Sequence, residues 1–245
     1  LLSEYLQFGG YPRVVLAQTF IEKQKAIAEI FQSFLEKDIA ILLRVEKSEN
    51  LSHLVRMLAQ QSGQLVNLAE LSRSVGVSMA TVKRYLWYLE KTFILERVFP
   101  FSRKRRKEIV KAPVCYFYDL GMLNFASGIF GAAPQMTKGL LFQNLVFWQV
   151  KSLLRWQNAS VNFWRTKDGS EVDFVVDRGQ EIIPIEVKFG NIITTRVPAG
   201  LMNFIRRYRP KRAYVINSSL SETVSSGGTN ISFLPFSRLL SLDWL

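Results

Sequence analysis

Two carboxylates and a lysine on neighbouring apolar stretches are the residues best suited to chemistry. Asp173 lies in the segment Glu-Val-Asp-Phe at 171–174, and Glu186 and Lys188 lie in Ile-Glu-Val-Lys at 185–188. Side chains alternate between the two faces of a strand, so Glu186 and Lys188 should share one face, as should the two acids of the first segment. If the two strands pair, Asp173, Glu186 and Lys188 converge.

This trio has a recognisable chemical use. Two carboxylates can hold a hard divalent cation such as Mg²⁺ or Mn²⁺, which also binds phosphate oxygens. Asp173 and Glu186 would be the ligands, and the backbone carbonyl of Val187 could add a third oxygen. Lys188 could orient an attacking water or stabilise charge on the phosphate. A single His and a single Cys exclude a zinc site of Cys and His ligands within the chain.

The same residues also fit a plain amphipathic hairpin whose charges face water. An exposed cross-strand Glu–Lys pair contributes little stability and needs no function. The sequence leaves this alternative open.

The elements around the trio predict an α/β domain with a mixed sheet over residues 139–245. A helix should begin near Gly139, and a basic helix should cover 196–209. Predicted strands cover 161–165, 171–176, 182–188, 213–217 and 231–235, with 218–228 as a loop. The order of strand hairpin, helix and strand suits a mixed sheet flanked by helices, similar to restriction endonucleases.

Residues 51–120 carry the pattern of a winged helix. A first apolar stripe at 51–59 is followed by a helix beginning at Asn67, a turn at Gly76 and a helix capped by Ser78. Strands at 93–99 and 114–118 would form the wing. Between them lies a run of five cations: Arg103, Lys104, Arg105, Arg106 and Lys107.

The charge distribution points to nucleic acid. Net charge is +12, and residues 51–138 hold 13 Lys or Arg against 5 Asp or Glu. On the third helix of the winged domain, Lys83 and Arg84 should face solvent, where cations meet phosphates. DNA is the expected partner, although winged helices also bind proteins, so a partner protein or a homo-oligomer stays open.

The rest of the chain sets its context. Residues 1–50 read as a helical segment and 121–138 as a linker, giving an α+β protein overall. Among the apolar stretches of the sequence, none has the length needed to cross a bilayer, and one Cys fits a reducing cytoplasm. Because the chain opens at Leu1 in mid-pattern, we expect it to be part of a longer protein.

The order of short motifs resembles a known family over essentially the full length. Asp173 followed by Glu186-Val187-Lys188 matches the PD-(D/E)XK nuclease pattern. The whole chain resembles the C-terminal half of a group of prokaryotic AAA-type ATPases, with a winged helix and a nuclease-like domain of unassigned function. The other matching landmarks are Gly9-Gly10-Tyr11-Pro12, Lys37-Asp38-Ile39, the helix-turn-helix at 68–89, Tyr118-Asp119-Leu120-Gly121 and Gly139 with Asn144.

Two departures from that family matter. The chain has no Gly-x-x-x-x-Gly-Lys-Ser/Thr motif, so ATP is expected only through a domain not in this chain. The resemblance also implies an acid on the first helix of the nuclease-like domain, where this chain has Gln143. A neutral amide is a poorer cation ligand, which weakens the expected metal site.

Three functions therefore remain open. The chain is a metal-dependent nuclease guided by its winged helix, or a non-catalytic DNA- or protein-binding regulator of an ATPase, or a protein-binding scaffold.

Overall fold

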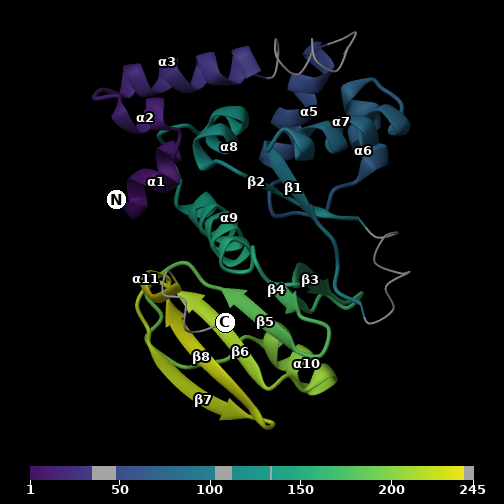
Figure 1. Cartoon of the computed structure of the whole chain (residues 1–245), viewed down its shortest axis with the longest axis vertical. Coiled ribbons are helices and arrows are strands. Elements are labelled where there is room, and N and C mark those ends of the chain that lie inside the picture. The colour runs from purple at the N-terminus through teal and green to yellow at the C-terminus, as the bar shows by residue number, and fades with distance from the viewer. Residues whose placement is uncertain (35–47, 103–111, 133, 240–245) are drawn as a thin grey trace. The chain divides into compact units, whose positions relative to one another are not determined.

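The computed structural model describes residues 1–34, 48–102, 112–132 and 134–239. The chain divides into two compact units, one of Leu1–Arg97 with Ala112–Asn144 and one of Val98–Lys111 with Leu145–Leu245. Helices dominate the first unit and a mixed six-stranded sheet forms the second, so the predicted α+β class is confirmed (Figure 1).

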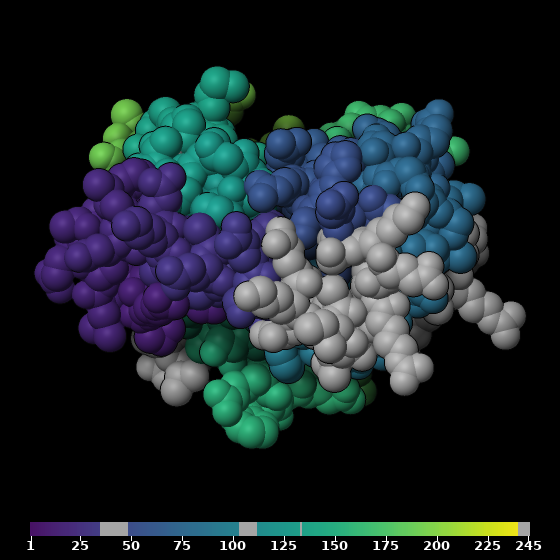
Figure 2. Space-filling model, turned by 90° about the horizontal axis from the view of Figure 1, so that it is seen from above, coloured from purple at the N-terminus to yellow at the C-terminus, as the bar shows by residue number. Residues whose placement is uncertain are grey.

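The first unit opens with three helices that pack around a fourth. These are α1 (Leu2–Phe8), α2 (Pro12–Leu16), α3 (Phe20–Phe31) and, much later in the chain, α8 (Leu120–Ser127). On the face in Figure 2, the purple residues of α1–α3 lie against the teal residues that include α8. Val14, Ala26 and Ile27 form a small core there, with Phe125 packed against it. Residues 121–138, expected as a linker, therefore contain a buried helix.

A buried carboxylate joins the first turn of the chain to the start of α8. Asp119 caps α8 by accepting the backbone N–H of Met122 at 2.9 Å, and its other oxygen accepts the N–H of Gly10 at 2.7 Å. The chain segments approach so closely that a Cβ added at Gly121 would lie 2.1 Å from the carbonyl oxygen of Phe8. Glycine is therefore required at position 121.

The predicted helix-turn-helix is confirmed within the first unit. It follows α5 (Ser48–Gln60) and consists of α6 (Leu68–Val75) and α7 (Met79–Lys91). Asn67 and Ser78 cap the two helices with their side chains, and Gly76 ends α6 in the left-handed conformation at φ 72°. Each of these features could be predicted from the sequence because helix caps and left-handed turns favour particular residue types.

A small sheet follows the three helices, as expected for a wing. It pairs β1 (Leu95–Val98) with β2 (Val114–Phe117), and Leu65 adds an antiparallel bridge to Val114. The basic run between the strands lies outside the described residues.

The second unit is built on one sheet with strand order β3-β4-β5-β6-β8-β7 (Figure 1). The central pairs β5–β6 and β6–β8 are parallel, and the outer pairs are antiparallel. The strands are β3 (Ser160–Arg165), β4 (Glu171–Asp177), β5 (Ile182–Val187), β6 (Arg212–Asn217), β7 (Glu222–Ser226) and β8 (Thr229–Pro235). The expected loop at 218–228 thus contains β7.

Helices pack against the sheet and bury its apolar side chains. On α10 (Ala199–Tyr208), Leu201, Phe204 and Ile205 pack into a core with Val172 and Val175 of β4. Phe147, on the long helix α9 (Gln135–Leu153), packs its ring against Phe174 with centroids 5.8 Å apart. The short helix α11 (Phe236–Leu239) follows β8.

One segment expected to belong to the wing is part of the second unit instead. Phe101 donates its N–H to the carbonyl of Phe163 at 2.5 Å, and Phe163 donates to Phe99 at 3.2 Å. The Phe101 side chain is buried in the core between the sheet and α10. Residues 98–101 therefore extend the sheet beyond β3, and the compact units do not divide at residue 120 as the sequence suggested.

Among the described residues, no helix combines the length and apolar character needed to span a bilayer.

Candidate functional site

A β-bulge marks the point where Asp173 enters the sheet. Asn162 pairs with Val175 whereas Trp164 pairs with Val172, so β4 places Asp173 and Phe174 opposite the single residue Phe163. A bulge bends its strand and re-aims a side chain. The simple alternation assumed for residues 171–176 is thus interrupted at Asp173.

The structure brings the predicted trio together. Phe174 pairs with Ile185 across β4 and β5, so Asp173 and Glu186 are the residues next to this pair. The Asp173 carboxylate accepts the backbone N–H of Val187 at 2.7 Å. Lys188 places its ammonium nitrogen 2.8 Å from Oε1 of Glu186. The main chain of Lys188 is held in place by donating to Ile216 of β6 at 2.8 Å.

Burial makes this cluster electrostatically unusual. The side chain of Glu186 is 7% exposed, whereas that of Lys188 is 50% exposed. Desolvation, and then repulsion from Glu186, raises the pKa of Asp173 to about 8. Desolvation also raises the pKa of Glu186, although Lys188 partly offsets this effect. Partial burial alone would lower the pKa of Lys188, but Glu186, together with Asp173 and Glu171, outweighs it and the net shift is upward.

One oxygen of this cluster is left without a partner. Among the described residues, nothing forms a hydrogen bond with the buried Oε2 of Glu186. A buried polar atom without a partner costs free energy, and clusters of strongly perturbed pKa values are enriched at functional sites. Two neighbouring carboxyl groups, one half-buried and one buried with a spare oxygen, fit a hard divalent cation, which would relieve both the repulsion and the missing contact. The described part of the chain holds no group of three or more Asp, Glu, His or Cys spaced to bind a metal.

Glu171 belongs to the surroundings of this cluster, although the sequence did not single it out as a site residue. Its charge acts on Asp173, Glu186 and Lys188. The side chain is exposed and lies 3.4 Å from Arg165 on β3. The signal in the sequence was its position two residues before Asp173.

Gln143, the expected counterpart of a family acid, lies half-buried on α9 within the first unit. An added Cβ at Gly63 would be 3.5 Å from its Oε1, so the amide lies near the turn after α5. The neighbouring Asn144 is buried and clamps β2, accepting the N–H of Phe117 at 2.8 Å and donating to its carbonyl at 2.7 Å. The landmark Asn144 therefore has a structural role.

The exposed face of α7 carries the predicted nucleic-acid contacts. Lys83 and Arg84 are exposed, and Trp87 is 50% exposed with Lys91 5.8 Å from its ring centre. The other predicted contacts, Arg103, Lys104, Arg105, Arg106 and Lys107, lie outside the described residues.

Comparison with protein families agrees with a two-part chain. A family model described as "Domain of unknown function (DUF8612)" matches residues 1–133. The chain belongs to this family. A second model, "Domain of unknown function (DUF4143)", matches residues 138–239 of this DUF8612 protein and covers the sheet with its acid pair.

Relatives of the DUF8612 chain occur in distant prokaryotes. An uncharacterized protein of Haemophilus influenzae is 28% identical over 251 residues, covering 100% of this chain and 58% of the relative. An uncharacterized protein of Mycobacterium tuberculosis is 28% identical over 183 residues, covering 74% of this chain and 41% of the relative. An uncharacterized protein of Methanocaldococcus jannaschii is 20% identical over 190 residues, covering 75% and 41%. The chain thus spans about half the length of these relatives.

Proposed function

We propose that this chain is a DNA-associated module that binds Mg²⁺ or Mn²⁺ at Asp173 and Glu186 and cleaves phosphodiester bonds. The observation that carries the proposal is the cluster itself. Lys188 lies 2.8 Å from Glu186, and Asp173 is tied to Val187 between them. A purely structural hairpin would leave such charges in water, whereas here Glu186 is buried with one oxygen unpaired.

The residues divide the chemistry between them. Asp173 and Glu186 would hold the cation, with the carbonyl of Val187 as a further oxygen. When bound, the cation would offset charge on the phosphate and make a neighbouring water a better nucleophile. Since its pKa is raised, Lys188 keeps its proton at neutral pH. It therefore acts by donating hydrogen bonds and stabilising charge, not as a base.

The proposal places the chain within a longer ATPase. The relatives are about twice as long as the matched region, and the motif order resembles the C-terminal half of AAA-type ATPases. ATP would bind only to a domain outside this chain. The free, buried Cys115 fits a reducing cytoplasm.

Cleavage of plasmid and single-stranded DNA with Mg²⁺ or Mn²⁺ tests the proposal. We expect cutting by the unaltered protein and its loss in Lys188→Ala, with unchanged circular dichroism. Lys167→Ala, which removes an exposed lysine of the hairpin turn after β3, is the matched control and should cut normally. Equal cutting by the protein and Lys188→Ala would refute the assigned role of the cluster.

A second candidate is a non-catalytic module that binds DNA or a partner protein and regulates the ATPase. Two observations favour it. Gln143 supplies no charge where the family pattern has an acid, and α7 offers exposed Lys83, Arg84 and Trp87. Binding of DNA without cutting by any preparation would establish this candidate over the first.

A further inference from the structure

The first unit contains a cavity of about 470 Å³ that lies apart from the helix-turn-helix surface already described. Pockets for small ligands commonly have volumes of about 300–1,000 Å³. Of its ten lining residues, five are aromatic and one, Asp119, is an acid. A negatively charged aromatic cavity is unexpected in a protein whose net charge is +12.

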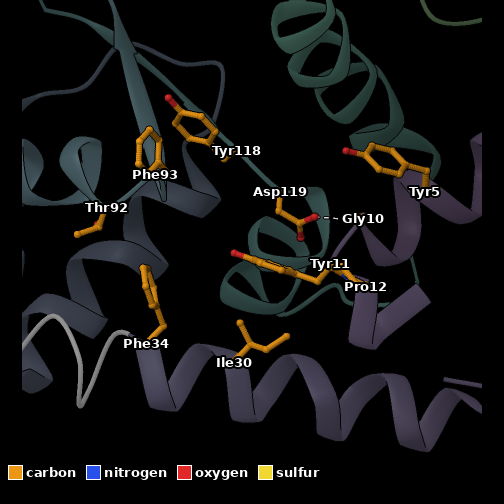
Figure 3. Close-up of a pocket in the computed structure, with 10 residues that line it drawn as sticks. All are labelled: Tyr5, Gly10, Tyr11, Pro12, Ile30, Phe34, Thr92, Phe93, Tyr118 and Asp119. Carbon is orange, nitrogen blue, oxygen red and sulfur yellow. Dashed lines mark hydrogen bonds between the residues drawn. The ribbon is translucent and has the colours of Figure 1, made fainter. Parts of the chain in front are cut away.

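Its walls come from segments far apart in the sequence. Figure 3 shows the ring of Tyr11 extending from the turn before α2 into the middle of the space, with Asp119 on one side and Phe34 on the other. Phe93 and Tyr118 stand together at a further wall, with ring centres 5.5 Å apart and planes at 87°.

The carboxylate supplies charge, and backbone groups already use part of its capacity for hydrogen bonds. Asp119 is 9% exposed and accepts the backbone N–H groups of Gly10 and Met122, and those of Gly121 and Tyr11 also act on it. A carboxylate has about four acceptor positions, and the N–H groups of Gly10 and Met122 occupy two of them. These donors also favour the charged form, against the burial that raises its pKa.

The negative charge of Asp119 acts on the tyrosines that line the cavity. Burial first, and the charge of Asp119 second, raises the pKa of Tyr11 to about 12 and raises the pKa of Tyr5. The same field that disfavours a phenolate favours a cation beside these rings.

Phe93 is an unusual residue for its backbone position. It follows the C-cap of α7 with φ 57°, where glycine is the usual residue, and the residue is 67% exposed. A bulky residue at positive φ is strained, and such strain is concentrated at functional sites. We attribute the phenylalanine at this position to its ring, which lines the cavity.

We propose that this cavity binds a methylated ammonium group, held by the aromatic rings around Tyr11 and Phe93 and by the fixed charge of Asp119. Cations are attracted to aromatic rings, and quaternary ammonium groups need no hydrogen-bond acceptor. Because backbone N–H groups already engage both oxygens of Asp119, its carboxylate offers a guanidinium or primary ammonium fewer acceptor positions than an open carboxylate would. The group belongs to a small free cation or to a methylated lysine side chain.

Titration with choline, followed by calorimetry and by the proton resonance of its N-methyl groups, tests this proposal. We expect binding, an upfield shift of that resonance from the rings, and affinity about tenfold above that of choline's neutral isostere, in which carbon replaces nitrogen. Ethanolamine should bind more weakly than choline. Equal binding of the neutral isostere would show a merely apolar cavity and overturn the proposal, as would absence of any choline binding.

Phe93→Gly separates ligand contact from folding, since glycine suits a φ of 57°. We expect this variant to fold and to bind choline about fivefold more weakly. Arg209→Gly, which changes the other non-glycine residue at positive φ among those described, and Trp156→Ala, which removes a ring that is 84% exposed, should bind normally. Unchanged affinity in Phe93→Gly would contradict the proposal. A peptide with trimethyllysine that binds more tightly than choline would identify a protein source, and equal affinity would identify a free cation.

Discussion

The ammonium nitrogen of Lys188, which directly follows β5, lies 2.8 Å from Oε1 of Glu186, with the ammonium group half exposed and the carboxylate buried. The lysine engages Oε1 and leaves Oε2 without a partner among the described residues. Their contact therefore leaves one oxygen of Glu186 without a hydrogen bond, and Asp173 adds a second carboxyl group close by. A structure that keeps this imbalance in a central strand has stability to gain from a bound cation.

Asp173 should make the stability of the protein depend on pH. Its pKa is about 8 in the folded state and about 3.9 in an unfolded chain, so the folded state binds the extra proton between these values. Stability should therefore fall as pH rises from about 5 to about 8. Urea unfolding at the two ends of this window should show a smaller fall for Asp173→Asn, whose amide oxygen still accepts from Val187.

Asp168→Asn, in the exposed turn before β4, is the control for this measurement and should retain the full pH dependence. A dependence unchanged by Asp173→Asn would contradict the assignment.

The contact between α10 and β4 should tolerate no side chain at Gly200. A Cβ there would lie 2.0 Å from the carbonyl oxygen of Glu171, which cannot move without breaking the strand that carries Asp173. We expect Gly200→Ala to lower the free energy of unfolding by about 3 kcal/mol. Gly139→Ala is the matched variant, because nothing lies near its Cβ. It should stabilise α9 by about 0.5–1 kcal/mol. Equal effects of the two would refute the close contact.

Phe93→Gly should stabilise the fold, since a residue in the left-handed region costs about 1–2 kcal/mol relative to glycine. Arg209→Gly, at φ 50° after α10, should gain a similar amount. Thermal unfolding of both variants measures this gain. A loss of stability in Phe93→Gly would show that its ring packs structurally, and would leave no strain to explain.

The exposed face of α7 should bind DNA through its cations. Replacing Lys83 and Arg84 together with Ala should weaken binding and lower the salt slope of log K by about 2, because each cation releases roughly one counterion. Fluorescence anisotropy at several salt concentrations measures both quantities. Lys25→Ala, an exposed cation on α3, should leave them unchanged. A slope unaffected by the double change would exclude this face.

The local features of the helix-turn-helix could be predicted because each depends on a residue type. Asn67 and Gly76 mark the start and end of α6, and Ser78 marks the start of α7. Helix α8 escaped prediction because nearly all its residues are buried, so it lacks the polar face that makes a helical period visible. The association of Phe99–Phe101 with the sheet is a long-range pairing that no local pattern reveals.

The acid pair was predictable and its surroundings were not. Alternation along two strands was enough to bring Asp173, Glu186 and Lys188 together. The bulge at Asp173 and Phe174 depends on how β3 pairs with β4, and the burial of Glu186 depends on both neighbours of β5. Those tertiary features create the raised pKa values.

Direct binding of Mn²⁺, measured by electron paramagnetic resonance of the free ion, tests the central claim most directly. We predict one site per chain that tightens as pH rises towards 8, because the ion displaces a proton from the pair. Glu186→Gln should abolish the site, and Asp177→Asn, at the far end of β4, should keep it. Absence of Mn²⁺ binding at pH 8, or equal binding by Glu186→Gln, would contradict a cation site at Asp173 and Glu186.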